Sequence, residues 1–269
     1  MPLLDNYNLL IDTVRETDGV LAIGKSGGKA VPEHNENDID IFIFCNQVPD
    51  ANTREAVIKK AGSAVSWMKI SETAGRFWGV CDFATIDNTD ICLMYFTVSD
   101  MNDEIESVLN GSRLDRESEY FYPTGRCATF LSMYILYDKT GYIADMKEKL
   151  SVYPQSLAEK LYFHHIRKIN DGEDFERAVS RGDILFYHAT LELAIDHFLQ
   201  ALFALNQCWF PSRKRTLQFA QEFKIKPRDC FERLLKVIEL GSVAETLAQS
   251  YEIWSALCTG LSDMPAFKK

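Results

Sequence analysis

Residues 38–44 read DIDIFIF, which places Asp38 and Asp40 two positions apart on an apolar run. Alternate residues of a strand point to the same face, about 7 Å apart, so the two carboxylates share one predicted face and the isoleucines the other. Neighbouring carboxylates repel each other unless a cation lies between them, and a hard cation such as Mg²⁺ prefers oxygen ligands. The stretch therefore predicts a strand with a metal-binding edge. The alternative is that both aspartates form only the polar face of an edge strand.

A second motif precedes this strand. Residues 19–26 read GVLAIGKS and match the phosphate-loop pattern G-x-x-x-x-G-K-[ST]. A phosphate loop needs a strand, then a flexible loop, then a helix whose N-terminus meets the phosphates. Here the four residues between the glycines are themselves an apolar strand, and residues 27–37 contain a proline that a helix interior does not tolerate. We therefore interpret the match as coincidental.

A third carboxylate begins a later strand. Residues 77–86 and 89–98 are two predicted strands joined by a hairpin-like turn at Asp87-Asn88, and Asp90 opens the second of them. If that strand lies beside residues 38–44, Asp90 completes a cluster with Asp38 and Asp40. Three acids and a bound metal suit in-line nucleotidyl transfer, because the metal neutralises the phosphates and one acid accepts a proton from the attacking hydroxyl.

The character of the chain changes near residue 150. Strand and helix patterns alternate before it, including a predicted helix at 51–65 and a strand with a turn at 131–141. After it the patterns are helical, at 155–169, 175–205, 212–223, 228–240 and 242–258. We expect an α+β protein with a mixed-sheet domain over residues 1–150 and an all-helical bundle domain over residues 151–269.

Composition narrows the class of partner. The formal net charge of −10 over 269 residues makes nucleic acid an improbable ligand and favours small molecules. The seven cysteines are odd in number and form no C-x-x-C pair, so we expect a reducing cytoplasm and no zinc or disulfide framework. Residues 1–10 lack the basic start and long apolar run of a signal peptide, so we expect none there. The most apolar stretch, 184–205, carries too many polar residues for us to expect a membrane span.

The ordered set of motifs resembles a known superfamily. Residues 23–44, IGKSGGKAVPEHNENDIDIFIF, followed by TDICLMYF at 89–96, resemble the nucleotidyltransferases of DNA polymerase β type. The chain is most similar to bacterial antibiotic nucleotidyltransferases, which act on lincosamides and aminoglycosides, and to uncharacterised relatives. The resemblance implies a polymerase-β-like catalytic domain and a helical domain that binds the acceptor. It also implies Mg²⁺-dependent transfer of a nucleoside monophosphate, AMP from ATP, to a hydroxyl of a small acceptor, with release of pyrophosphate.

The resemblance also implies roles for individual residues. Asp38 and Asp40 would be metal ligands, and Asp90 would be the third acid, as ligand or general base. Gly24 and its loop would hold the triphosphate.

The chain departs from the family after Gly24, where a small residue usually follows directly. Here Lys25 follows and Ser26 comes one position later, so either Ser26 takes the phosphate contact or Lys25 adds charge. Lys214, in the basic run 213–215, would reach the triphosphate or would simply be part of a solvated helix start.

Two other functions remain open. Arg181 and His188 fit the R-x₄₋₆-H spacing of HEPN-type RNase toxins, so a toxin–antitoxin module acting on RNA or on a protein partner is the alternative. The other is an inactive fold that binds nucleotide only.

Overall fold

The computed structural model describes residues 2–26, 38–75, 77–117, 121–214, 216–265 and 267. The chain forms two compact units. The first contains Met1–Ser107 and Arg126–Val152, and the second contains Val108–Gly125 and Tyr153–Lys269. The chain therefore leaves the first unit at residues 108–125 and returns to it before it enters the second unit again at residue 153, an excursion that the sequence patterns did not indicate.

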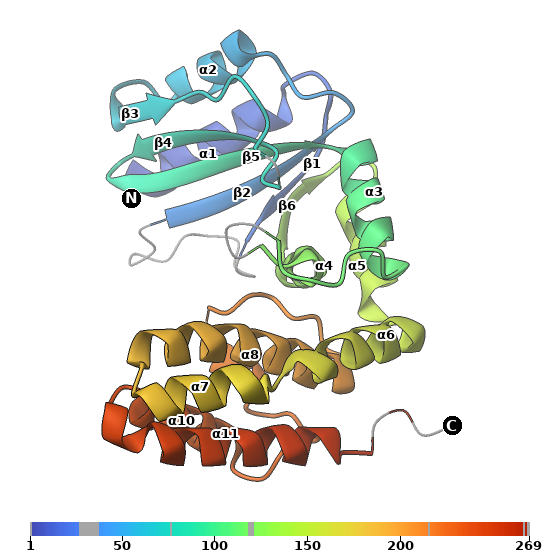
Figure 1. Ribbon diagram of the computed structural model, residues 1–269. Helices are drawn as coiled ribbons and strands as arrows, with labels where there is room; N and C mark the ends of the chain where they lie inside the picture. The colour runs from blue at the N-terminus through green and yellow to red at the C-terminus, as the bar shows by residue number, and fades with distance from the viewer. Residues whose placement is uncertain are drawn as a thin grey trace. The chain divides into compact units, whose positions relative to one another are not determined.

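A six-stranded mixed sheet forms the centre of the first unit (Figure 1). The strands are β1 (Val20–Lys25), β2 (Asp38–Cys45), β3 (Val65–Lys69), β4 (Val80–Ile86), β5 (Thr89–Thr97) and β6 (Tyr134–Asp138), in the order β3-β4-β5-β2-β1-β6. The β2 and β5 strands pair in parallel, and the other neighbours pair antiparallel. Together with the helices that follow, this sheet confirms the predicted α+β class.

One face of the sheet is covered by α1 (Pro2–Arg15) and α2 (Ala51–Lys59). The alternate isoleucines of β2 point into this layer, where they are almost fully buried beside Ile91 and Leu93 of β5. Because strand side chains alternate between faces, the aspartates of β2 must then lie on the opposite face. Packing of the core thus decides which face carries the acidic residues.

The other face packs against α4 (Pro123–Ser132) and α5 (Tyr142–Ser151). The ring of Phe44 in β2 lies 5.3 Å from that of Phe130 and 5.2 Å from that of Tyr142, measured between centroids. Neither helix was expected, and the strand predicted at 131–141 is confined to Tyr134–Asp138. The start of α5 is fixed by Gly141, whose φ of 77° needs a glycine, and by Asp138, whose Oδ2 accepts the Ala144 N–H.

The predicted helix at 51–65 is also too long. Helix α2 ends at Lys59, Gly62 turns the chain with a φ of 62°, and Val65 begins β3. The hairpin between β4 and β5 is confirmed, because Asp87 and Asn88 have φ angles of 49° and 63°, as a tight hairpin turn requires. The first unit also contains most of α3 (Val98–Leu109).

The second unit is helical. Its elements are α6 (Gln155–His165), the short 3₁₀ helix η3 (Ile166–Lys168), α7 (Gly172–Arg181), α8 (Ile184–Leu205), α9 (Thr216–Ala220), α10 (Cys230–Leu240), the short 3₁₀ helix η4 (Ala244–Thr246) and α11 (Leu247–Ser262). The single helix predicted at 175–205 is two helices. Gly182 ends α7 with a φ of 62°, and the Asp183 carboxylate caps α8 by accepting the Phe186 N–H.

Helix α8 is the most apolar element of this unit and lies in its core. Its Phe198 packs against Trp254 of α11, whose indole N–H donates to the Ile169 carbonyl at 3.1 Å. Of the helices in the described parts of the chain, none combines the length and the apolar character that a membrane crossing requires.

Candidate functional site

The parallel pairing of β2 with β5 brings the predicted carboxylates together. Asp38 is in register with Asp90, and Asp40 is in register with Cys92. In-register residues of neighbouring strands lie on the same face at about 4.8 Å, and residues two apart share that face as well. Asp38, Asp40 and Asp90 therefore form one cluster, and all three are exposed while the Ile39 between the first two is buried.

Hydrogen bonds orient part of this cluster. Thr85 of β4 lies opposite Asp90, and its hydroxyl donates to Asp90 Oδ1 at 2.7 Å. The carboxylate of Asp38 makes no hydrogen bond or ion pair with the residues that the structure describes. Thr85 was not identified from the sequence. The Asp87-Asn88 turn could have indicated it, because residues 85 and 90 are equally far from that turn and therefore pair across the hairpin.

Thiol groups lie on the same face. Cys92 neighbours Asp40 in register, and the Cys81 thiol lies close enough to accept a hydrogen bond from Cys92. This hydrogen bond has the largest effect on the pKa values of both thiols. It lowers the pKa of Cys81 and raises the pKa of Cys92. Neither cysteine was singled out from the sequence.

The residues that match the phosphate-loop pattern lie in or beside β1. Val20 to Ile23 are strand residues that follow helix α1, which is the arrangement expected for a coincidental match. Close packing favours glycine at position 24, because a β-carbon there would overlap the side chain of Met133. Residues 27–37 of the predicted triphosphate loop lie outside the described residues.

Lys25 and Ser26 occupy different positions relative to the acids. Lys25 is in register with Ile41, which places it on the face opposite to the carboxylates. Its side chain is 2% exposed, and its ammonium group donates to the Ser26 carbonyl at 3.3 Å. The Ser26 N–H donates to the main-chain carbonyl of Asp40 at 3.0 Å, so Ser26 is tied directly to the acidic strand.

Lys214 lies in the second unit, whereas the three carboxylates lie in the first. It is exposed, and its backbone N–H donates to the Ser212 hydroxyl at 3.1 Å. Its neighbour Arg213 is engaged instead with Glu192 at 3.1 Å and Asp196 at 3.4 Å on α8. Arg215 lies outside the described residues.

The HEPN-like pair is split between two helices. Arg181 is the last residue of α7 and is exposed, whereas His188 is half-buried in the second turn of α8.

An acid–histidine cluster in the second unit was not predicted. Asp115, His164 and His165 can offer ligand atoms that all lie within 4.8 Å of one another. Lys168 already lies among them, 2.9 Å from Asp115 Oδ1 and 3.0 Å from His164 Nε2, while His165 Nε2 is 2.9 Å from the Leu114 carbonyl. Burial would raise the pKa of Asp115, but hydrogen bonds from His164 and Lys168 hold it at about 2. The cluster is thus an ion-paired network that holds a protein cation.

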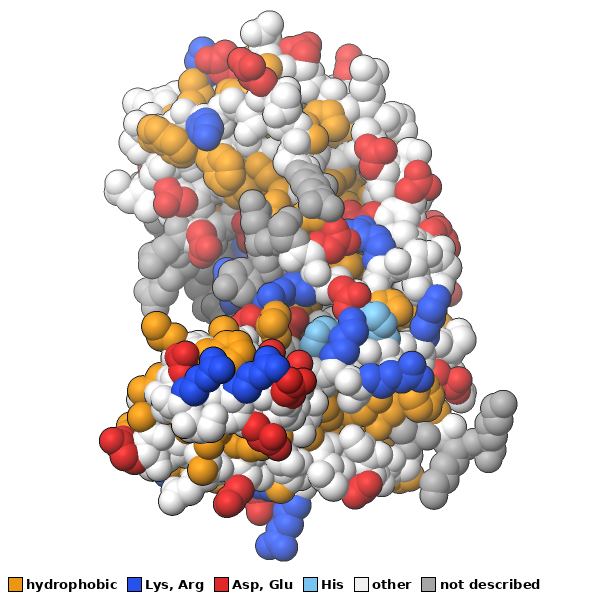
Figure 2. All heavy atoms as spheres, viewed as in Figure 1, with side chains coloured by type: hydrophobic (Ala, Val, Ile, Leu, Met, Phe, Trp, Pro, Cys, Tyr) orange, Lys and Arg blue, Asp and Glu red, His pale blue; other side chains and the backbone are white. Residues whose placement is uncertain are grey.

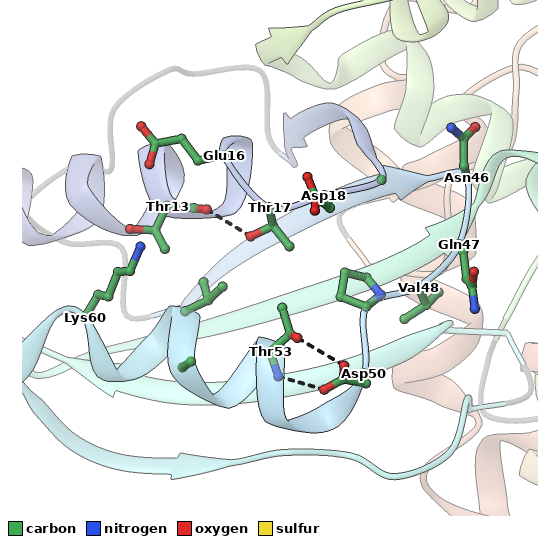
Figure 3. A pocket seen from close by; sticks show the side chains of 14 residues that line it. Thr13, Glu16, Thr17, Asp18, Asn46, Gln47, Val48, Asp50, Thr53 and Lys60 are labelled. Carbon is green, nitrogen blue, oxygen red and sulfur yellow. Dashed lines mark hydrogen bonds between the residues drawn. The ribbon is translucent and has the colours of Figure 1, made fainter.

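A cavity of about 900 Å³ lies elsewhere in the first unit, between the end of α1 and the start of α2 (Figure 3). Glu16, Asp18 and Lys60 are among its lining side chains, and Asp50 accepts hydrogen bonds from the amide and hydroxyl of Thr53. None of the predicted site residues lines it.

Comparisons with known proteins give limited matches. Residues 122–215 match a family described as a domain of unknown function, DUF4037. No curated protein matches the chain. The crystal structure of a nucleotidyltransferase-like protein from Exiguobacterium sibiricum 255-15 is similar over 96% of this chain and 73% of that one, with 10% sequence identity and a TM-score of 0.47.

Proposed function

We propose that the chain is a metal-dependent nucleotidyltransferase that moves a nucleoside monophosphate, AMP from ATP, to a hydroxyl group of a small acceptor. The observation that carries this proposal is the in-register pairing of Asp38 with Asp90 on the face that also bears Asp40. A set of exposed carboxylate oxygens suits a hard divalent cation such as Mg²⁺ better than a softer metal. Mg²⁺ bound there would neutralise the charge on the triphosphate and on the leaving pyrophosphate.

Each carboxylate has a part in the proposed reaction. The acceptor oxygen attacks the α-phosphorus, the bond from that phosphorus to the bridging oxygen of the β-phosphate breaks, and pyrophosphate leaves with the bonding electrons. Asp38 and Asp40 hold the cation. Asp90 takes the proton of the acceptor hydroxyl, because Thr85 orients the carboxylate through Oδ1 and leaves Oδ2 for the proton.

The phosphate contact is assigned to Ser26 in preference to Lys25. Ser26 is hydrogen-bonded to the backbone of the acidic strand, whereas the register of Lys25 turns its side chain to the opposite face. Gly24 allows the backbone to lie close to the Met133 side chain two residues before Ser26. Hydroxylated antibiotics of the lincosamide and aminoglycoside kinds are the first acceptors to test.

The test incubates the protein with Mg²⁺, α-labelled ATP and a panel of hydroxylated small molecules, and detects pyrophosphate together with an acceptor that gains AMP. Asp38→Asn and Asp40→Asn should each lower the rate at least a hundredfold, since a lost metal ligand costs several kcal/mol in the transition state. Asp103→Asn, which changes an exposed acid of α3, is the matched control and should keep the wild-type rate. Wild-type turnover in a folded Asp40→Asn protein would contradict the proposal.

A further inference from the structure

A cavity of about 570 Å³ lies within the helical unit, between the segment that joins α6 to α7 and one face of α8. Phe186, Ala189, Leu193 and His197 recur on α8 at helical spacing and line one wall. Arg167 and Lys168 lie on the facing segment. Leu193 remains 53% exposed, so this apolar wall is left open to a ligand. Figure 2 shows histidine side chains beside lysine and arginine side chains on the visible surface of this unit.

Hydrogen bonds fix the protonation of His165, the buried neighbour of the cavity residue His197. The Leu114 carbonyl can only accept, so His165 Nε2, 2.9 Å away, must carry a proton. His165 is fully buried, and burial is the main reason that its pKa falls to about 3, so the ring is neutral and Nδ1 has a lone pair. His197 Nδ1 lies 2.9 Å from that nitrogen and must donate to it.

The second nitrogen of His197 is then left as an acceptor. Burial, followed by the charge of Lys168, lowers the pKa of His197, so its ring is also neutral near pH 7 and Nε2 carries a lone pair. Within the described residues Nε2 makes no hydrogen bond. An acceptor whose tautomer is fixed by a buried partner, on the wall of a cavity, is arranged to receive a proton donor from a ligand.

The charged residues of the lining differ in whether they are already paired. Lys168 pairs with Asp115 at 2.9 Å, and Asp174 pairs with Arg177 at 3.2 Å. Asp171 caps α7, where its Oδ1 accepts the Asp174 N–H at 3.3 Å. Arg167 makes no ion pair within the described parts of the chain, so it is the lining cation with which a ligand anion can pair.

We propose that this cavity is a binding site for a small amphipathic organic anion that carries a hydroxyl group. The hydroxyl donates to His197 Nε2, the anionic group lies beside Arg167, and the apolar body packs on Phe186 and Leu193. The site stands on the helical unit alone and does not depend on the proposed transfer reaction.

The test uses 3-hydroxybenzoate as the probe, because it combines an apolar ring, an anion and a hydroxyl donor. Benzoate lacks the donor and phenol lacks the anion, while 4-hydroxyphenyl phosphate distinguishes a phosphate from a carboxylate. Binding is followed through the ¹⁵N shifts of the histidine side chains. We expect 3-hydroxybenzoate or its phosphate counterpart to shift Nε2 of His197 and to bind about threefold to tenfold more tightly than benzoate, as one net hydrogen bond predicts.

Two variants separate binding from folding. His197→Asn keeps an N–H that can donate to His165 but lacks Nε2, and Arg167→Gln removes an exposed cation without touching the core. Each should weaken binding of the hydroxylated anion at least threefold, while Arg181→Gln, an exposed arginine of α7 outside the cavity lining, should not. Equal binding by benzoate and 3-hydroxybenzoate, or unchanged binding in Arg167→Gln, would overturn the proposal. If His197→Asn does not fold, those two comparisons decide it.

Discussion

Replacing Asp82 with alanine should destabilise the first unit severely. Asp82 is 0% exposed, and its Oδ1 accepts hydrogen bonds from Arg54 at 2.5 Å and from the Ser71 N–H at 3.0 Å. Burial raises the pKa of Asp82, although Ser71 and Arg54 both lower it. Asp82→Ala leaves the Arg54 guanidinium, whose side chain is 4% exposed, without its counter-charge. Breaking a buried ion pair in this way costs about 3–5 kcal/mol, and an orphaned N–H adds about 1 kcal/mol.

A paired replacement tests the reason for that loss. Asp82 Oδ2 is buried without a hydrogen-bond partner among the described residues, so the native pair is incompletely satisfied. Arg54→Met with Asp82→Leu removes both charges at similar volume and should cost less than about 2 kcal/mol, because no unpaired charge remains.

The measurement is urea unfolding followed by tryptophan fluorescence, with the slope against denaturant compared between variants. A loss of less than about 1 kcal/mol in the free energy of unfolding of Asp82→Ala would refute the reasoning, since leaving a buried guanidinium unpaired should cost several kcal/mol. A double variant as unstable as Asp82→Ala would refute it too, because apolar contact would then fail to replace the ion pair.

The remaining predictions concern packing, pH and catalysis. Gly24→Ala should cost about 1–3 kcal/mol through overlap with Met133, and Met133→Ala should relieve that cost; strict additivity in thermal unfolding would contradict the packing role. His165 has a pKa near 3 when folded and 6.5 when unfolded, so the unfolded state binds more protons between these values. The free energy of unfolding should therefore fall by up to about 1.4 kcal/mol per pH unit below pH 6.5, and His165→Gln should flatten that slope in acid titrations. Lys25→Ala should reduce pyrophosphate release only partly, whereas Asp40→Ala should abolish it; orthophosphate release with the reverse dependence would restore the phosphate-loop interpretation.

The acidic face could be predicted because short-range rules determine it. Alternation in residues 38–44 assigns the aspartates and isoleucines to opposite faces, and the Asp87-Asn88 turn fixes how β4 pairs with β5. Only the placement of β5 beside β2 required a guess about long-range pairing, and the parallel register of Asp38 with Asp90 agrees with it.

What could not be predicted depends on tertiary packing. The apolar patterns of α4 and α5 are too short to predict helices from the sequence. What their apolar residues pack on is shown only by the structure, in which Phe130 and Tyr142 contact Phe44 of the sheet. The orientation of Lys25 follows from its pairing with Ile41, which no local pattern indicates. The tautomer of His197 depends on a backbone carbonyl 83 residues earlier in the sequence, at Leu114 (197 − 114 = 83).

Because residues 108–125 belong to the second unit, the gene cannot be cut at one point into two parts that each encode one complete unit and nothing else. Helix α8 and the chain that follows it both bind that segment, because the Tyr122 hydroxyl donates to Asp196 of α8 and the Thr124 hydroxyl donates to the Phe210 carbonyl at 3.0 Å. A fragment that starts at residue 151 would lack Tyr122 and Thr124. A fragment that ends at residue 150 would contain both residues but not the groups that accept their hydrogen bonds. A single recombination break therefore cannot separate one unit cleanly from the other. The two units are expected to be exchanged, lost and duplicated only as one piece.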